Sequence, residues 1–136
     1  MRVIGGTFKG KKLFLPNDKN TRPLKDLVKE SIFNLIHHSK KINIEIKNSI
    51  ILDLFSGSGS FGIECLSRGA KKVIFLENYS EAIKVLEKNI KSLKNIKNFE
   101  IIENDCFNYF NSDQRVNQKF DIIFIDPPYK EININE

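Results

Sequence analysis

The sequence lacks any apolar run of about 18 residues, the length that a transmembrane helix needs. Residues 1–20 are rich in glycine and lysine and have no continuous apolar stretch, which argues against a signal peptide. The two cysteines, Cys65 and Cys106, do not have the spacing of a metal site, so we expect reduced thiols that pack within helices. These absences predict a cytoplasmic protein with no bound metal and no contact with a membrane.

Charge is distributed unevenly along the 136 residues, a length that suits one compact domain. Residues 1–50 carry a net charge of +7, whereas residues 51–136 carry −2. A basic part joined to an acidic part is typical of a protein that holds a polyanion with one region and performs chemistry with the other. Lys, Ile and Asn are abundant throughout, so composition offers a second explanation and charge alone leaves nucleic-acid binding open.

The basic part has two recognisable features. Residues 2–15, called the arm below, alternate short apolar stretches with glycine and lysine, which predicts a small hairpin or an extended segment. The Thr-Arg-Pro sequence at 21–23 is a typical helix entry, and apolar residues at helical spacing predict an amphipathic helix over 23–38. Residues 39–48 fit either a linker or a short strand.

From residue 49 onward, predicted strands alternate with predicted helices. This order implies right-handed crossovers and a parallel sheet with helices on both faces, an α/β fold of the Rossmann type. We therefore divide the chain into residues 1–48, which hold the arm and the first helix, and residues 49–136, which form the sheet domain. The predicted strands are 49–55, 72–77, 99–103 and 120–126, and the predicted helices are 61–68, 80–93 and 105–110.

A glycine-rich turn, Asp53-Leu-Phe-Ser-Gly-Ser-Gly-Ser-Phe-Gly62, follows the first predicted strand. Glycine lets the backbone approach a ligand closely, and the start of the next helix offers unpaired N–H groups. Glu77 ends the second strand, where a carboxylate can accept the ribose hydroxyls of an adenosine. The pattern suits NAD, FAD or S-adenosylmethionine, and also a turn that only packs a helix on a strand. Asp53 favours S-adenosylmethionine because its charge would attract the methionine ammonium and repel a pyrophosphate.

Asp105, just after the third predicted strand, has two interpretations. It could meet an adenine amino group, or it could cap the helix that starts beside it, and one residue could do both. The aromatic residues Phe107, Tyr109 and Phe110 are better explained as core than as a platform for a base. The candidate cofactor-binding residues are Asp53, Phe55, Ser56, Gly57, Ser58, Gly59, Gly62, Glu77, Asn78, Asp105 and Cys106.

The second motif, Asp126-Pro127-Pro128-Tyr129, ends the fourth predicted strand. Two prolines cannot continue a sheet, so the segment must leave it rigidly. An exocyclic base amine is a poor nucleophile, and the Asp126 carboxylate and the Pro127 carbonyl could accept its hydrogens while Asp126 takes up the proton. Tyr129 could stack on an extruded base. These four candidate catalytic residues should lie beside the glycine loop, where the strand order reverses. The alternative is that the motif only ends the strand, and that role would need neither the acid nor the aromatic residue.

Together these segments resemble the RsmD family, bacterial enzymes that methylate the 2-amino group of a guanine in 16S ribosomal RNA. The likeness covers residues 2–129 and is carried by residues 52–70, by 2–13 within the arm, by 21–23 and by 28–34. It implies a class I methyltransferase fold that uses S-adenosylmethionine. The family normally continues past the Asp-Pro-Pro motif with a further helix and further strands. We therefore expect a sheet truncated after its fourth strand, with an open edge that could pair with a second copy.

The resemblance also implies roles for individual residues. It implies S-adenosylmethionine at the glycine loop, with Glu77 on the ribose and Asp105 near the adenine, and the target guanine at residues 126–129. The implied partner is 16S ribosomal RNA or a small-subunit assembly particle. The alternatives are an adenine-N6 methyltransferase acting on DNA or RNA, and a fragment that binds RNA or cofactor without turnover. RNA contacts are expected from Arg2, Lys9, Lys11, Lys12, Arg22 and Lys29.

Overall fold

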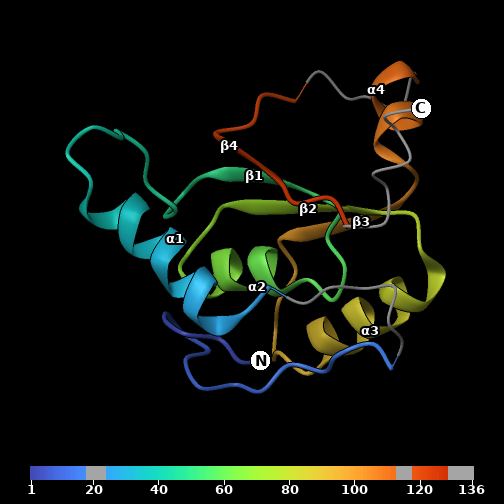
Figure 1. Cartoon of the computed structure of the whole chain (residues 1–136), viewed down its shortest axis with the longest axis horizontal. Coiled ribbons are helices and arrows are strands. Elements are labelled where there is room, and N and C mark those ends of the chain that lie inside the picture. The colour runs from blue at the N-terminus through green and yellow to red at the C-terminus, as the bar shows by residue number, and fades with distance from the viewer. Residues whose placement is uncertain (18–23, 113–117, 129–136) are drawn as a thin grey trace.

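The computed structural model describes residues 1–17, 24–112 and 118–128. Within them, strands and helices alternate, and the strands form one parallel sheet in the order β3-β2-β1-β4 (Figure 1). The predicted α/β fold is confirmed, and the first and fourth strands are neighbours. The elements are α1 (Asp26–His38), β1 (Ile50–Leu54), α2 (Ser60–Ser67), β2 (Lys72–Glu77), α3 (Ser80–Lys91), β3 (Phe99–Glu103), α4 (Cys106–Asn111) and β4 (Ile122–Ile125).

The sheet carries a separate apolar cluster on each face. Ile51 and Phe75 belong to the larger cluster, on the side covered by α2 and α3, whereas Leu52 and Ile74 pack with Tyr109 of α4 on the other side (Figure 1). Side chains alternate between the faces of a strand, so the nearly continuous apolar runs of β1 and β2 fill both layers. Helices therefore cover both faces, as the sequence predicts. None of the helices in the described part of the chain is long and apolar enough to cross a bilayer.

The arm folds back on itself and packs against α2. Arg2 and Lys12 form an isolated antiparallel bridge, and the Val3 N–H donates to the Lys11 carbonyl over 2.9 Å. The Val3 side chain is fully buried in the same cluster as Ile51 of β1. The hairpin-like arm thus contributes to the core that stabilises the sheet. The division of the chain at residue 48 stays a prediction.

Several helix ends differ from the predicted ones. The first helix begins at Asp26, and the predicted entry at 21–23 lies outside the described residues. α3 begins at the predicted residue, Ser80, and ends at Lys91, two residues before the predicted end. The Glu77 carboxylate accepts the N–H groups of Asn78 and Tyr79, just before the helix. Residues 39–48 contain turns and no strand.

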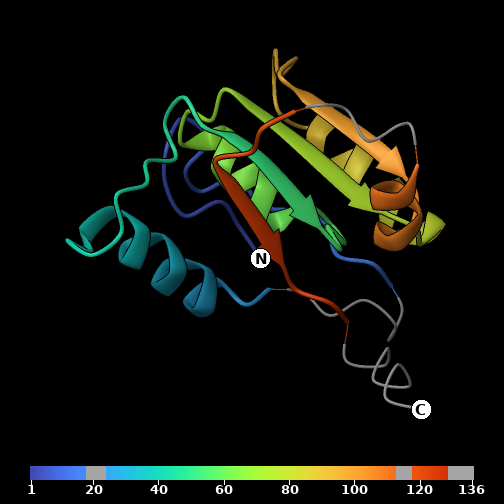
Figure 2. The ribbon, with the colours of Figure 1, turned by 90° about the horizontal axis from the view of Figure 1, so that it is seen from above.

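β4 lies at the free edge of the sheet (Figure 2) and is shorter than the predicted strand. It stops at Ile125 because two prolines follow within three residues and neither can donate to a ladder. Phe124 faces the larger cluster. Ile123 and Ile125 face the other way and are 48% and 63% exposed. The predicted open, hydrophobic edge is therefore present in the described part of the chain.

Candidate functional site

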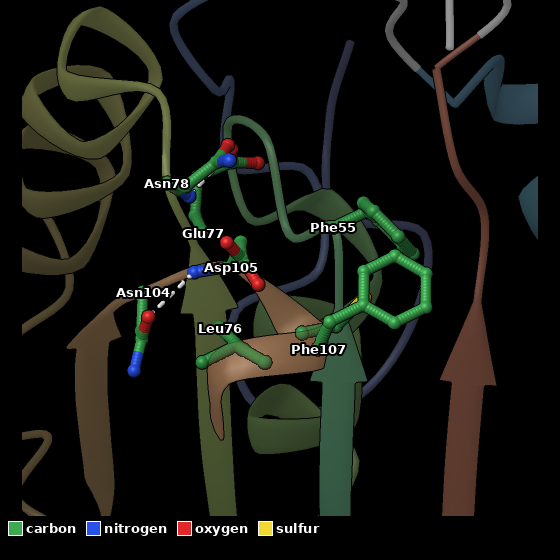
Figure 3. Close-up of a pocket in the computed structure, with 8 residues that line it drawn as sticks. Phe55, Leu76, Glu77, Asn78, Asn104, Asp105 and Phe107 are labelled. Carbon is green, nitrogen blue, oxygen red and sulfur yellow. Dashed lines mark hydrogen bonds between the residues drawn. The ribbon is translucent and has the colours of Figure 1, made fainter. Parts of the chain in front are cut away.

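A pocket opens where the carboxyl ends of β1, β2 and β3 meet (Figure 3). In a parallel α/β sheet this end is where ligands normally bind, because the loops that follow the strands converge there. Five of the eight lining residues belong to the candidate cofactor-binding set derived from sequence. The lining residues are Phe55, Leu76, Glu77, Asn78, Asn104, Asp105, Cys106 and Phe107.

The glycine loop (residues 55–62) turns sharply from β1 into α2. Phe55, Gly57 and Gly59 all have positive φ, at 57°, 57° and 89°, which folds the backbone back on itself. A Cβ on Gly59 would lie 2.2 Å from Leu86 Cδ1, and a Cβ on Gly62 would lie 2.3 Å from the Phe75 ring. These two glycines therefore let α3 and β2 pack directly against the loop. Five predicted cofactor-binding residues of the loop do not line the pocket: Ser56, Gly57, Ser58, Gly59 and Gly62.

Glu77 connects the end of β2 to the glycine loop. Its Oε1 accepts the Gly57 N–H over 2.8 Å, and its Oε2 accepts the N–H groups of Asn78 and Tyr79, each over 3.0 Å. A carboxylate oxygen can accept two hydrogen bonds, so Oε1 keeps capacity for a further donor in the pocket. The geometry is compatible with the predicted contact to a ribose hydroxyl.

Asp105 is the N-cap of α4. Its Oδ1 accepts the Asn108 N–H over 2.7 Å, and its Oδ2 accepts the Asn108 side-chain amide over 2.9 Å. The cap interpretation is therefore confirmed. Asp105 also lines the pocket beside Asn104 (Figure 3), so the contact with an adenine stays a prediction.

Asp53 lies buried beneath the glycine loop, only 1% exposed, and does not line the pocket. Its Oδ2 accepts the Gly62 N–H over 3.2 Å, so it orders the first turn of α2. Burial raises the pKa of Asp53 to about 8, with the charges of Glu77 and Asp126 acting in the same direction and the Gly62 N–H opposing them. One oxygen of the Asp53 carboxyl group is engaged by α2, and its contact with a methionine ammonium stays a prediction.

Asp126 follows directly after β4 and lies next to the glycine loop. The register pairs Leu54 of β1 with Ile125 of β4, so the residues after them, Phe55 and Asp126, leave the sheet side by side. The charge of Asp126 also contributes to the raised pKa of Asp53. Pro127 and Pro128 follow β4 outside the sheet, and Tyr129 lies outside the described residues.

An aromatic stack joins β4 to the glycine loop. The rings of Phe124 and Phe61 lie 3.8 Å apart between centroids and nearly parallel, and Phe61 also stacks on Phe33 of α1 at 5.1 Å. Phe61 belongs to the loop, and Phe124 stands two residues before Asp126. The stack thereby fixes the spacing between the two sequence motifs.

The arm presents part of the predicted RNA-contacting set to solvent. Arg2, Lys9, Lys11 and Lys12 are all exposed, whereas Arg22 lies outside the described residues. The prediction for Lys29 is wrong, because its side chain is fully buried and its Nζ lies 3.2 Å from Glu64 Oε1. A phosphate group cannot contact the Lys29 ammonium unless this ion pair separates and the side chain becomes exposed.

Sequence reasoning missed two buried polar residues, Glu64 and Asn89. Glu64 accepts the N–H groups of Ile4 and Gly5 over 2.8 and 2.9 Å and pairs with Arg68 and Lys29. Burial alone would raise the pKa of Glu64, but the Ile4 N–H, Arg68, the Gly5 N–H and Lys29 outweigh it and hold that pKa below its usual value. The sequence signal that could have identified them is a charged or polar residue among the apolar residues on one face of a helix.

The prediction that Phe107 belongs to the core is wrong. Its side chain is 65% exposed and lies at the rim of the pocket near Phe55 (Figure 3), and Phe110 is 38% exposed. Tyr109 is buried, as predicted, and Cys65 is a buried packing residue. A helix as short as α4 contains too few turns for its sequence to show which face is buried.

Comparisons with known proteins agree with this arrangement. The Bacillus subtilis protein YlbH is 40% identical over 96% of this chain and 68% of its own length. Ribosomal RNA small subunit methyltransferase D of Haemophilus influenzae is 38% identical over 95% of the chain and 64% of its length. The solved structure of the Escherichia coli protein yhhF superposes with a TM-score of 0.74 at 30% identity, covering 97% of this chain and 66% of that one. The chain thus spans about two thirds of the length of these relatives.

One family model, described as conserved hypothetical protein 95, matches residues 1–136. With relatives above 30% identity spanning almost all of the same residues, the chain belongs to this family, the RsmD family, and its sheet is of the class I methyltransferase type.

Proposed function

We propose that this chain transfers a methyl group from S-adenosylmethionine to the exocyclic 2-amino group of a guanine in 16S ribosomal RNA. The observation that carries the proposal is the register between β1 and β4, which sets Asp126 beside the glycine loop. Relatives that are 31–41% identical to this chain are named ribosomal RNA small subunit methyltransferase D. Such a substrate would place the protein in the cytoplasm.

The pocket residues fit S-adenosylmethionine. Glu77 supplies an oriented acceptor for a ribose hydroxyl, while Phe55, Leu76 and Phe107 supply apolar surface for a flat heterocycle. The neighbouring carboxylates Glu77 and Asp105 suit a positively charged ligand better than a pyrophosphate. When bound, the cofactor supplies a methyl group bonded to a positively charged sulfur, and attack by a nucleophile transfers that methyl group.

The catalytic contribution of the chain is to hold and activate the amine. A base amine has its lone pair delocalised into the ring, so it attacks only when that lone pair is localised. The Asp126 carboxylate and the Pro127 carbonyl would accept the two amine hydrogens and stabilise the positive charge that develops on the nitrogen. Asp126 would then accept the proton that leaves. The aromatic stack of Phe124 on Phe61 would keep these acceptors at a fixed distance from the glycine loop.

RNA would reach the site across the arm. Arg2, Lys9, Lys11 and Lys12 are exposed on it and can contact phosphate groups without reading sequence. Arg22 and Tyr129 remain proposed contacts to the RNA and to the target base. The edge of β4 that is open in the described residues could pair with a second copy of the chain.

Methyl transfer from labelled S-adenosylmethionine to three acceptors tests the proposal. We expect product on under-modified small-subunit particles or naked 16S RNA, and none on duplex DNA. Asp126→Ala should lower the rate by at least about 100-fold, as loss of a proton acceptor typically does, with cofactor affinity unchanged. Product on DNA alone would favour the adenine-N6 alternative, and an active Asp126→Ala variant would refute the assigned role.

A further inference from the structure

Asn89 is a fully buried polar residue on α3 that joins two segments far apart in the sequence. Its Oδ1 accepts the Phe14 N–H over 2.7 Å, and its Nδ2 donates to the Phe14 carbonyl over 3.1 Å and to the Ser58 carbonyl over 2.8 Å. Both ends of the amide are engaged, so its partners fix which end is nitrogen. Phe14 lies near the end of the arm, and Ser58 lies in the glycine loop. Asn89 therefore ties the arm to the loop.

Lys29 makes a second connection from the other end of the arm. Its Nζ donates to the Arg2 carbonyl over 2.6 Å and to Ser60 Oγ over 3.0 Å, and it pairs with Glu64 over 3.2 Å. The three hydrogens of the ammonium thus have three acceptors within reach. Ser60 is only 4% exposed and begins α2 within the glycine loop. Two buried side chains from different helices therefore reach the same loop.

Both residues break the apolar pattern of their surroundings. Asn89 lies on the buried face of α3, between Leu86 and Ile90, where an apolar residue would pack at lower cost. A buried amide or ammonium is tolerated only when its hydrogen bonds are satisfied, as they are here. Such departures from the pattern are expected where a residue serves a purpose beyond stability.

The glycine loop connects Asn89 and Lys29 to the pocket. Ser58 directly follows Gly57, whose N–H donates to the pocket carboxylate of Glu77 over 2.8 Å. Moving the Ser58 carbonyl would therefore disturb the contact that orients Glu77. Neither Asn89 nor Lys29 lines the pocket, so any effect on a ligand must pass through the loop.

We propose that Asn89 and Lys29 are positioning residues that clamp the glycine loop to the arm and hold it in the shape that binds S-adenosylmethionine. The inference rests on the proposed cofactor site. It assigns the arm a second task, because the backbone of the arm at Arg2 and Phe14 supports the cofactor loop while its exposed basic side chains remain available to RNA.

Calorimetric titration of the whole chain with S-adenosylmethionine tests the clamp. Asn89→Asp keeps the size and the acceptor for Phe14, but it turns a carboxylate oxygen toward two carbonyl oxygens. Ser67→Ala is the matched control, because Ser67 Oγ also joins the arm to α2, through Phe8 and Gly5, without touching the loop. We expect Asn89→Asp to raise the dissociation constant ~5- to 10-fold and Ser67→Ala less than ~2-fold, although both lower the urea midpoint.

Ser60→Ala provides a second variant with little risk to folding, because it removes only the contact of Lys29 within the loop. It should raise the dissociation constant ~2- to 5-fold. Equal effects of Asn89→Asp and Ser67→Ala, or unchanged affinity in both loop variants, would overturn the clamp. Glu77→Gln distinguishes an error in the proposed cofactor site from an error in the proposed clamp. If it leaves affinity unchanged, the proposed cofactor site is wrong and the clamp falls with it. If it weakens binding while the loop variants do not, only the clamp is wrong.

Discussion

Asp53 shows how a single buried carboxyl group can set the pH response of the fold. Its pKa is raised to about 8 in the folded chain by burial, from an ordinary value of 3.8 in the unfolded chain. Between these values the folded state holds a proton that the unfolded state has lost. The free energy of unfolding therefore falls as pH rises through this window, at up to about 1.4 kcal/mol per pH unit, and the contribution is fully present only below pH 3.8.

Asp53→Asn should remove this pH dependence. Asparagine keeps the acceptor for the Gly62 N–H and has no proton to lose. Urea unfolding at several pH values should give similar stability for both proteins near pH 4 and an increasing advantage for the variant up to about pH 8. Parallel profiles for the two proteins would show that Asp53 is ionised in the folded state.

At the scale of elements, the buried pair of Lys29 on α1 and Glu64 on α2 stabilises the attachment of the first helix and the arm. Both side chains are fully buried, so removing one partner leaves an uncompensated charge. Glu64→Gln should lower the free energy of unfolding by about 3–5 kcal/mol in chemical denaturation. Glu81→Gln is a suitable control, because its pair with Lys84 is mostly exposed and should cost less than about 1 kcal/mol.

A double variant distinguishes a charge effect from a packing effect. Lys29→Met in the Glu64→Gln background removes the charge that was left without a partner, so part of the lost stability should return. If the two substitutions are simply additive, the pair does not interact through charge.

The elements themselves were largely predictable, whereas the contacts between them were not. The apolar runs and glycine turns of residues 49–103 identify the strands, their parallel order and the pocket, because each signal is local. Lys29 gave no such signal, since its partner Glu64 is brought to it only by the packing of α1 on α2. Asp53 was correctly placed at the end of β1, but the sequence did not reveal that its side chain turns toward α2.

At the scale of the whole molecule, β4 forms an edge of the sheet that no other strand of the described residues pairs with. Ile123 and Ile125 of β4 add exposed apolar surface at that edge. We expect light scattering to show a mass that rises with concentration, because an open edge offers backbone groups to a second chain. Ile123→Lys should reduce this association, and Ile44→Lys, an exposed site away from the sheet, should not. A constant monomeric mass would contradict the expectation.

The attachments of the arm also bear on the order of folding. The arm precedes the sheet in the sequence, and its partners on Glu64, Ser67 and Asn89 lie 59 to 75 residues further along the chain. Contacts of such long sequence separation form late, because the intervening chain must first be closed into a loop. We therefore expect the basic segment to stay unanchored until β1, β2 and the helices α2 and α3 have assembled.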